Sequence, residues 1–140
     1  MRLRSFLLAA IMTLSSLSVV IANDTVTTQD VDLSGNHVMT GNYTVSKGTT
    51  LTIKTGTVID MQNYWMNVEG TLVADNATIM SSIQTSGQGS HNAGVWDALT
   101  ISQIGSANLD NITISNAKSC MIVDGILTAK SLTIEDCLIG

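Results

Sequence analysis

The sequence predicts an all-β chain in which short parallel strands wind into a coil of stacked turns, and three observations support this. Residues 68–79 and 123–134 are identical at six of twelve positions, at an offset of 55 residues. A triplet of an aliphatic residue, Thr and Ile occurs five times. Apolar and polar residues alternate with the two-residue period of a strand that buries one face. One turn cannot bury its own apolar face, so stacked turns need similar residues at similar places.

The predicted strands follow from two recurring units. Thr and Ile are β-branched and favour strands. The triplets lie at 51–53, 77–79, 99–101, 112–114 and 132–134. The second unit is an apolar residue followed by a glycine corner, at 45–48, 68–70 and 123–125, and Gly105 is expected to serve the same purpose. We expect Val68 and Val123 in equivalent columns, with about one further turn between them.

Residues 1–22 predict a signal peptide in helical form. The segment begins with two arginines, continues as an uncharged apolar run of about 17 residues and ends at Val20-Ile21-Ala22, which suits cleavage after Ala22. The alternative is an uncleaved membrane anchor, but the run is shorter than the roughly 20 residues that a span needs. We therefore expect a secreted protein that is extracellular or displayed at the cell surface.

Composition limits the partners of the chain after cleavage. Both arginines leave with the leader, so four lysines and all 11 acidic residues remain, a net charge of −7. Nucleic acid and anionic lipid are excluded as partners, because both need cationic side chains. No later apolar run is long enough for a membrane span. Few aromatic residues and frequent Thr, Ser and Asn suit a narrow interior.

The order of these units resembles a known superfamily. Thr-Leu-Thr-Ile precedes Gly-Thr-Val within 41–62, Val-x-Gly-x-Leu-x-Ala follows within 66–79, and Trp96 introduces the strand within 94–101. This order, over about 41–137, is similar to the opening of a right-handed parallel β-helix of the pectin-lyase-like superfamily of secreted and cell-surface proteins. The usual Gly-Ile after the Trp is replaced by Ala98-Leu99. The resemblance implies a right-handed parallel β-helix (solenoid) of about four turns.

This reading divides the chain into three parts. Residues 1–22 form the signal peptide, 23–40 a polar N-terminal segment or cap, and 41–140 the β-helix turns. The polar, glycine-rich stretch 81–94 is expected to be a loop insertion. The rhythm continues to Gly140 without a polar cap, which predicts a fragment with an incomplete C-terminal end.

No catalytic, cofactor-binding or metal-binding residue is predicted. Enzymes with this resemblance commonly use an Arg base and a calcium cluster on acidic polysaccharides, and the chain has no Arg after residue 22. Glycoside hydrolysis needs two carboxylates at a fixed separation. The candidates, most of them at expected turns, are Asp75, Asp97, Asp110, Asp124, Glu135 and Asp136. His37 and His91 have no partner at metal-ligand spacing and are expected at the surface.

Two kinds of covalent modification are predicted. Cys120 and Cys137 are the only cysteines, and export to an oxidising compartment favours a disulfide between them. The alternative is that both are free thiols that fill the core as small apolar side chains. Asparagine glycosylation sequons occur at Asn23, Asn42, Asn76 and Asn111.

These observations favour a secreted or surface-displayed structural or adhesive β-helix over an enzyme. The alternatives are a fragment of a carbohydrate-active enzyme, such as a polysaccharide lyase or glycoside hydrolase, and the start of an autotransporter-like passenger. The expected partners are extracellular glycans, or a further β-helix portion or subunit that caps the C-terminal end.

Overall fold

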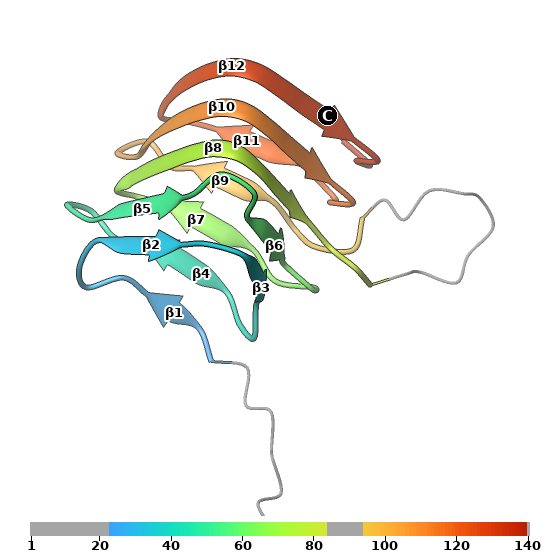
Figure 1. The fold of residues 1–140 in the computed structure, drawn as a ribbon, viewed down its shortest axis with the longest axis horizontal. Coiled ribbons are helices and arrows are strands. Elements are labelled where there is room, and N and C mark those ends of the chain that lie inside the picture. Colours follow the sequence, from blue (N-terminus) through green and yellow to red (C-terminus); the bar gives the residue numbers. More distant parts are fainter. Residues whose placement is uncertain (1–22, 84–93, 140) are drawn as a thin grey trace, which may run out of the picture.

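The protein is an all-β parallel solenoid of about five turns, as a computed structural model shows (Figure 1). The structure describes residues 23–83 and 94–139, in which every strand pairing is parallel and no helix occurs. The predicted signal peptide and positions 84–93 of the predicted insertion lie outside the described residues. Accordingly, the described part contains no helix that could cross a bilayer.

Each turn of the solenoid, here called a coil, contributes two or three strands. Coil 1 contains β1 (Thr25–Val26), β2 (Val31–Leu33) and β3 (Asn36–Val38), and coil 2 contains β4 (Tyr43–Val45), β5 (Thr50–Ile53) and β6 (Val58–Asp60). Coil 3 contains β7 (Met66–Val68) and β8 (Thr71–Met80). Coil 4 contains β9 (Leu99–Ile101) and β10 (Ser106–Ser115), and coil 5 contains β11 (Met121–Val123) and β12 (Ile126–Glu135). The segment 23–40, expected as a polar cap, forms coil 1, which accounts for five turns rather than four.

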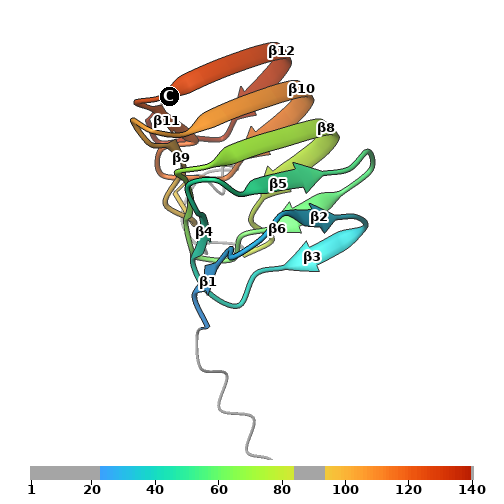
Figure 2. The same cartoon turned by 90° about the vertical axis from the view of Figure 1, so that its left-hand side faces the viewer.

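The strands stack into two sheets that enclose the core (Figure 2). Sheet A has the order β1-β4-β7-β9-β11, and sheet B has the order β2-β5-β8-β10-β12. In sheet B, β6 lies beside the second half of β8, and β3 lies beside β6. Each long strand of sheet B bends at one residue with a left-handed backbone, at Asn76 (φ 45°), Asn111 (φ 53°) and Ser131 (φ 56°). Asparagine tolerates this conformation better than most residues, which explains its recurrence at the bend.

The register confirms that like residues stack in columns. Val68 pairs with Ile101, and Ile101 pairs with Val123, so the two valines occupy one column with one coil between them. The five triplets, however, belong to three different columns. The triplet at 99–101 lies in sheet A, the one at 51–53 in the first half of sheet B, and the remaining three in its second half. Their uneven spacing along the sequence follows from this distribution.

The inward side chains form one continuous core. Leu72, Ile79 and Leu109 are fully buried, whereas outward threonines of the triplets keep part of their surface exposed. This alternation is what a strand with one buried face requires. Burial falls off at the last coil, since Ile114 is 0% exposed and Ile134, next in the same column, is 44% exposed.

Glycines at the corner between sheets A and B allow the coils to stack closely. A Cβ on Gly105 would lie against the carbonyl oxygen of Val68 and 2.9 Å from its carbonyl carbon. Gly70 and Gly125 meet backbone carbonyl oxygens of the preceding coil in the same way. Gly105 therefore occupies the corner position predicted for it, and the reason is close backbone approach.

Candidate binding groove on the outer face of sheet A

A groove of about 480 Å³ lies on the outer face of sheet A. Three strands form its floor through their central outward residues, Asn67 of β7, Thr100 of β9 and Ile122 of β11. Segments that enter these strands form one side. The residues on that side are Trp65, Asp97, Ala98, Lys118 and Ser119. The groove thus runs across coils 3 to 5, so its three floor residues are 22 to 55 positions apart in the sequence.

The side wall combines one aromatic ring with one ion pair. Trp65 precedes β7, and its backbone N–H donates to Oδ1 of Asn42 at 3.2 Å. The Lys118 ammonium donates to Oδ1 of Asp97 at 2.7 Å, and both side chains are more than half exposed. An exposed pair of this kind adds less than about 1 kcal/mol to stability. Asn67 donates from Nδ2 to Oε1 of Glu69 at 3.3 Å.

Trp96 is next to this wall in sequence but has a structural role. It is fully buried, and its indole N–H donates to the carbonyl oxygen of Ser115 at 2.8 Å. A buried indole N–H needs such a partner. Trp96 introduces β9 as expected, and it fixes the start of coil 4 below the exposed Asp97. The two tryptophans therefore divide the tasks of packing and surface presentation.

Asp60 is a nearly buried carboxylate that sequence reasoning did not identify. Its Oδ1 accepts from the backbone N–H groups of Gln62 (3.1 Å) and Ser82 (3.0 Å), and its Oδ2 accepts from Nε2 of Gln62 (2.7 Å) and from the Ser82 hydroxyl. Burial alone would raise the pKa of Asp60, but these four hydrogen bonds outweigh it and hold the pKa below its ordinary value.

The bonds around Asp60 belong to a framework at the base of the insertion. The Ser81 hydroxyl donates to the carbonyl oxygen of Gln62 at 2.6 Å, and Nδ2 of Asn116 donates to the carbonyl oxygen of Ser81 at 2.9 Å. On the other side of the insertion, the Gly94 N–H donates to the carbonyl oxygen of Ala117 at 3.0 Å. Residues 116–117 thus anchor both sides of the base, which holds the nearby groove wall in place.

The acidic residues singled out in the sequence lie in separate surroundings, except that Asp75 and Asp110 are neighbours in one column of sheet B. Asp75 accepts from the Thr55 hydroxyl (2.9 Å), and Asp110 faces the Lys130 ammonium at 3.9 Å on the bent face of sheet B. Asp97 alone belongs to the groove. Asp124, Glu135 and Asp136 are exposed. Within 23–83 and 94–139, no three His, Cys, Asp or Glu side chains gather where they could hold a metal ion.

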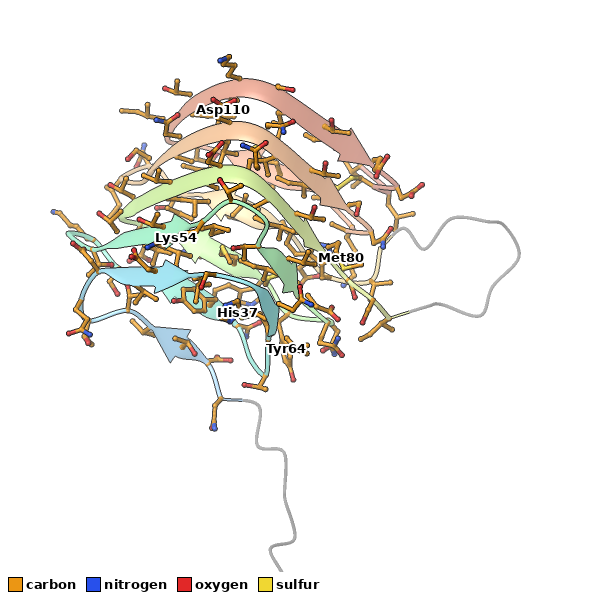
Figure 3. All side chains as sticks on the ribbon, in the orientation of Figure 1. His37, Lys54, Tyr64, Met80 and Asp110 are labelled. Atoms are coloured by element: carbon orange, nitrogen blue, oxygen red, sulfur yellow. A yellow bond between two sulfur atoms is a disulfide. The ribbon has the colours of Figure 1, made fainter. Side chains whose placement is uncertain are left out.

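The structure describes one of the two histidines, His37. His37 projects from β3, the outermost strand at the N-terminal end of sheet B (Figure 3), and its Nε2 lies 2.8 Å from the carbonyl oxygen of Ser34. His37 was predicted at the surface, but its side chain is half-buried and shares a column with Ile59 and Ile79. His91 lies outside the described residues.

The four sequons differ in surroundings. Asn23 is exposed, and Asn42 is half-buried beside Trp65. Asn76 and Asn111 stack at the bend of sheet B, where Nδ2 of Asn111 donates to Oδ1 of Asn76 and Nδ2 of Asn76 donates to Oδ1 of Asp75 at 2.7 Å. Both amides of this pair are therefore engaged, and the bond from Asn111 to Asn76 joins adjacent coils.

The structure joins Cys120 and Cys137 in a disulfide, with their Cα atoms 5.6 Å apart. Cys120 lies at the entry to β11 and Cys137 just beyond the end of β12. The bond therefore closes coil 5 into a covalent ring. It constrains a terminal coil, which has a neighbouring coil on a single side.

The chain has no significant match among protein-family profiles, curated proteins or solved structures. The groove was not predicted from sequence, since its residues occur as isolated Trp, Asn, Thr and Lys positions. The signal that could have revealed them is the register of sheet A. Aligning the three-residue strands 66–68, 99–101 and 121–123 places Asn67, Thr100 and Ile122 side by side.

Proposed function

We propose that the protein is a secreted or surface-displayed structural and adhesive β-solenoid that binds uncharged extracellular glycan in the groove on sheet A. The glycan assignment depends on one observation: the Trp65 ring lies in the same groove as Asn67, Thr100 and the ion pair between Asp97 and Lys118. Carbohydrate presents apolar C–H faces and rings of hydroxyls. An aromatic surface with a few fixed polar groups complements both.

Charge selects among the glycans. The chain beyond residue 22 carries a net charge of −7, so acidic polysaccharides are repelled at long range. Within the groove the Lys118 ammonium is 2.7 Å from the Asp97 carboxylate and is therefore already neutralised. Among the described residues that line the groove, no other cation is present to offset the repulsion of an acidic glycan. The groove therefore favours neutral sugars.

The alternative of a carbohydrate-active enzyme receives less support. Hydrolysis by the common mechanism needs an acid and a second carboxylate about 5 to 10 Å apart on either side of the bond. In the described part of the chain, the groove is lined by one carboxylate, Asp97, and that group pairs with a lysine. The groove geometry therefore supports binding more than bond cleavage. An autotransporter-like passenger would use the same groove for adhesion.

Glycan binding is tested with matched substitutions. Trp65→Ala should weaken binding of neutral oligosaccharides at least tenfold in isothermal titration calorimetry, since an aromatic contact contributes about 1.5–3 kcal/mol. Thr100→Ala should weaken it several-fold. Thr113→Ala removes the outward threonine of an equivalent triplet on sheet B, away from the groove, and should leave binding unchanged. Equal affinities for the Trp65 variant and the parent protein would reject the groove as the glycan site.

Secretion is tested separately by expression of the full chain in a secreting host. We expect the exported protein to begin at Asn23, which N-terminal sequencing would show. Protein retained in the membrane fraction with Met1 or the leader intact would contradict the predicted cleavage.

A further inference from the structure

We propose that the C-terminal face of the solenoid binds the N-terminal coil of a second copy of this chain, so that copies stack head to tail. The C-terminal face comprises the free edges of β11 and β12 with their inward side chains Val123, Leu127, Leu132 and Ile134. This inference rests on the proposed structural role, which it extends from a single rod to an assembly of rods.

The exposed inward residues of coil 5 show what this face lacks. Val123 is 42% exposed and Ile134 is 44% exposed, whereas Ile101 and Ile114, one coil earlier in the same columns, are fully buried. The earlier coil differs in having a neighbour on both sides. One more coil stacked on coil 5 would therefore bury these side chains. Exposed apolar surface next to unpaired strand edges marks an interaction site.

The free edges at the two ends are complementary. In the described residues, β11 and β12 pair on one side only, and so do β1, β2 and β3 at the other end. All pairings inside the solenoid are parallel, so each coil follows the last by the same kind of step along the axis. A second copy placed by one such step offers the matching edge for the same parallel pairing.

Two inward columns at the N-terminal end also fit this step, whereas the column of Ile134 would receive His37 of the incoming copy. Val31 and Leu33 are half-buried and pair with Leu51 and Ile53 of coil 2. Leu51 and Ile53 belong to the columns that continue through coils 3 and 4 to Leu127 and Ala129. Val31 and Leu33 of the incoming copy would therefore continue the two columns, with apolar side chains on both sides of the contact.

Charge favours head-to-tail stacking over two C-terminal faces in contact. The Lys130 ammonium is 3.9 Å from Asp110, and its side chain is 84% exposed. At the other end, Asp32 pairs with Lys54 across one coil step at 2.8 Å and is 61% exposed. Stacking head to tail brings acidic coil 1 toward Lys130. Two C-terminal faces in contact would instead bring copies of Asp124 and Glu135 together.

Analytical ultracentrifugation of the purified protein, with its N-terminus verified, tests the proposal. The weight-average mass should rise with concentration beyond that of a dimer, since a head-to-tail contact does not close. Ile134→Lys on the C-terminal face and Leu33→Lys on the N-terminal coil should each give monomers. Thr133→Lys places the same charge on the outward side of the same strand and should associate like the parent. Far-UV circular dichroism checks that each variant folds.

Mixing the two monomeric variants gives the sharpest result. Each keeps one intact end, so an equimolar mixture of the Ile134→Lys and Leu33→Lys proteins should form a one-to-one dimer that grows no further. A parent protein that stays monomeric at about 1 mM, where even weak complexes form, would overturn the proposal. So would a Leu33→Lys variant that still dimerises alone, because it would point to contact between C-terminal faces. Glycan binding by the Ile134→Lys monomer reports separately on the proposed function.

Discussion

Substitution of Gly105 by alanine tests the close stacking of the coils most directly. The added Cβ would press on the carbonyl oxygen of Val68, 2.9 Å from its carbonyl carbon and 3.3 Å from the carbonyl oxygen of Ser102. All three are backbone atoms, so no side chain can rotate away and the coils themselves must separate. We therefore expect a large loss of stability from one methyl group.

The magnitude follows from the contacts that this separation would disturb. The carbonyl oxygen of Val68 accepts from both the backbone N–H and the hydroxyl of Ser102, each at 3.0 Å. Two weakened hydrogen bonds cost about 1 kcal/mol each, and overpacking a filled site costs about 1–3 kcal/mol. The Gly105→Ala change should thus lower the free energy of unfolding by roughly 3–5 kcal/mol.

Gly48→Ala provides the matched control. Gly48 has a φ of 82° and nothing within 4 Å of an added Cβ, so alanine there costs only the left-handed backbone, about 1–2 kcal/mol. In thermal unfolding followed by far-UV circular dichroism, Gly105→Ala should lower the Tm by about 12 °C or more, and Gly48→Ala by less than about 10 °C. If Gly105→Ala were no more destabilising than Gly48→Ala, the close-stacking explanation would be wrong.

Three further predictions concern other bonds between and within coils. Asn111→Gly keeps the left-handed bend but loses the amide bond to Asn76, so chemical denaturation should show a loss of about 1 kcal/mol, and Asn111→Ala should lose about 1 kcal/mol more. Because the pKa of Asp60 is lowered in the folded protein, its carboxylate adds stability that is complete above the unfolded-state pKa. This stability is lost as the pH falls through the folded-state pKa. The difference in unfolding free energy between the parent and Asp60→Asn should therefore shrink in acid. Mass spectrometry should find no free thiol, and reducing Cys120–Cys137, which are 17 residues apart, should cost about 3 kcal/mol.

The parts of the fold that could be predicted are those in which apolar inward residues recur from coil to coil. In 68–74, the inward positions are filled by Val68, Gly70, Leu72 and Ala74, all buried, and the alternation is clear in the sequence. Coil 1 lies in the segment predicted as a polar cap, and its inward positions include Thr27 and His37. Thr27 is buried but bonded, with its Oγ1 accepting from the Ser46 N–H at 2.8 Å. Polar side chains at these inward positions weaken the apolar alternation of coil 1 in the sequence.

The candidate site was less predictable than the fold, because its residues come together only through register. Trp65 and Lys118 lie in segments without a repeated pattern, and each meets the groove because a different strand begins beside it. Asp60 ends its strand at an outward position where an exposed carboxylate is the ordinary expectation. It is nearly buried, and both Gln62 and Ser82, the latter one coil away, donate hydrogen bonds to it.

The anchored base of the insertion determines how freely this protein can change. The step from Leu72 to its partner Ala107 spans 35 residues, against 20 from Ala107 to Leu127. Closing the longer connection costs only about 0.5 kcal/mol more in chain entropy. Since the bonds of Ser81, Gly94 and Asn116 hold its two ends, evolution could lengthen, shorten or exchange the intervening stretch at little thermodynamic cost. Such variation would then leave the stacked coils of the scaffold untouched.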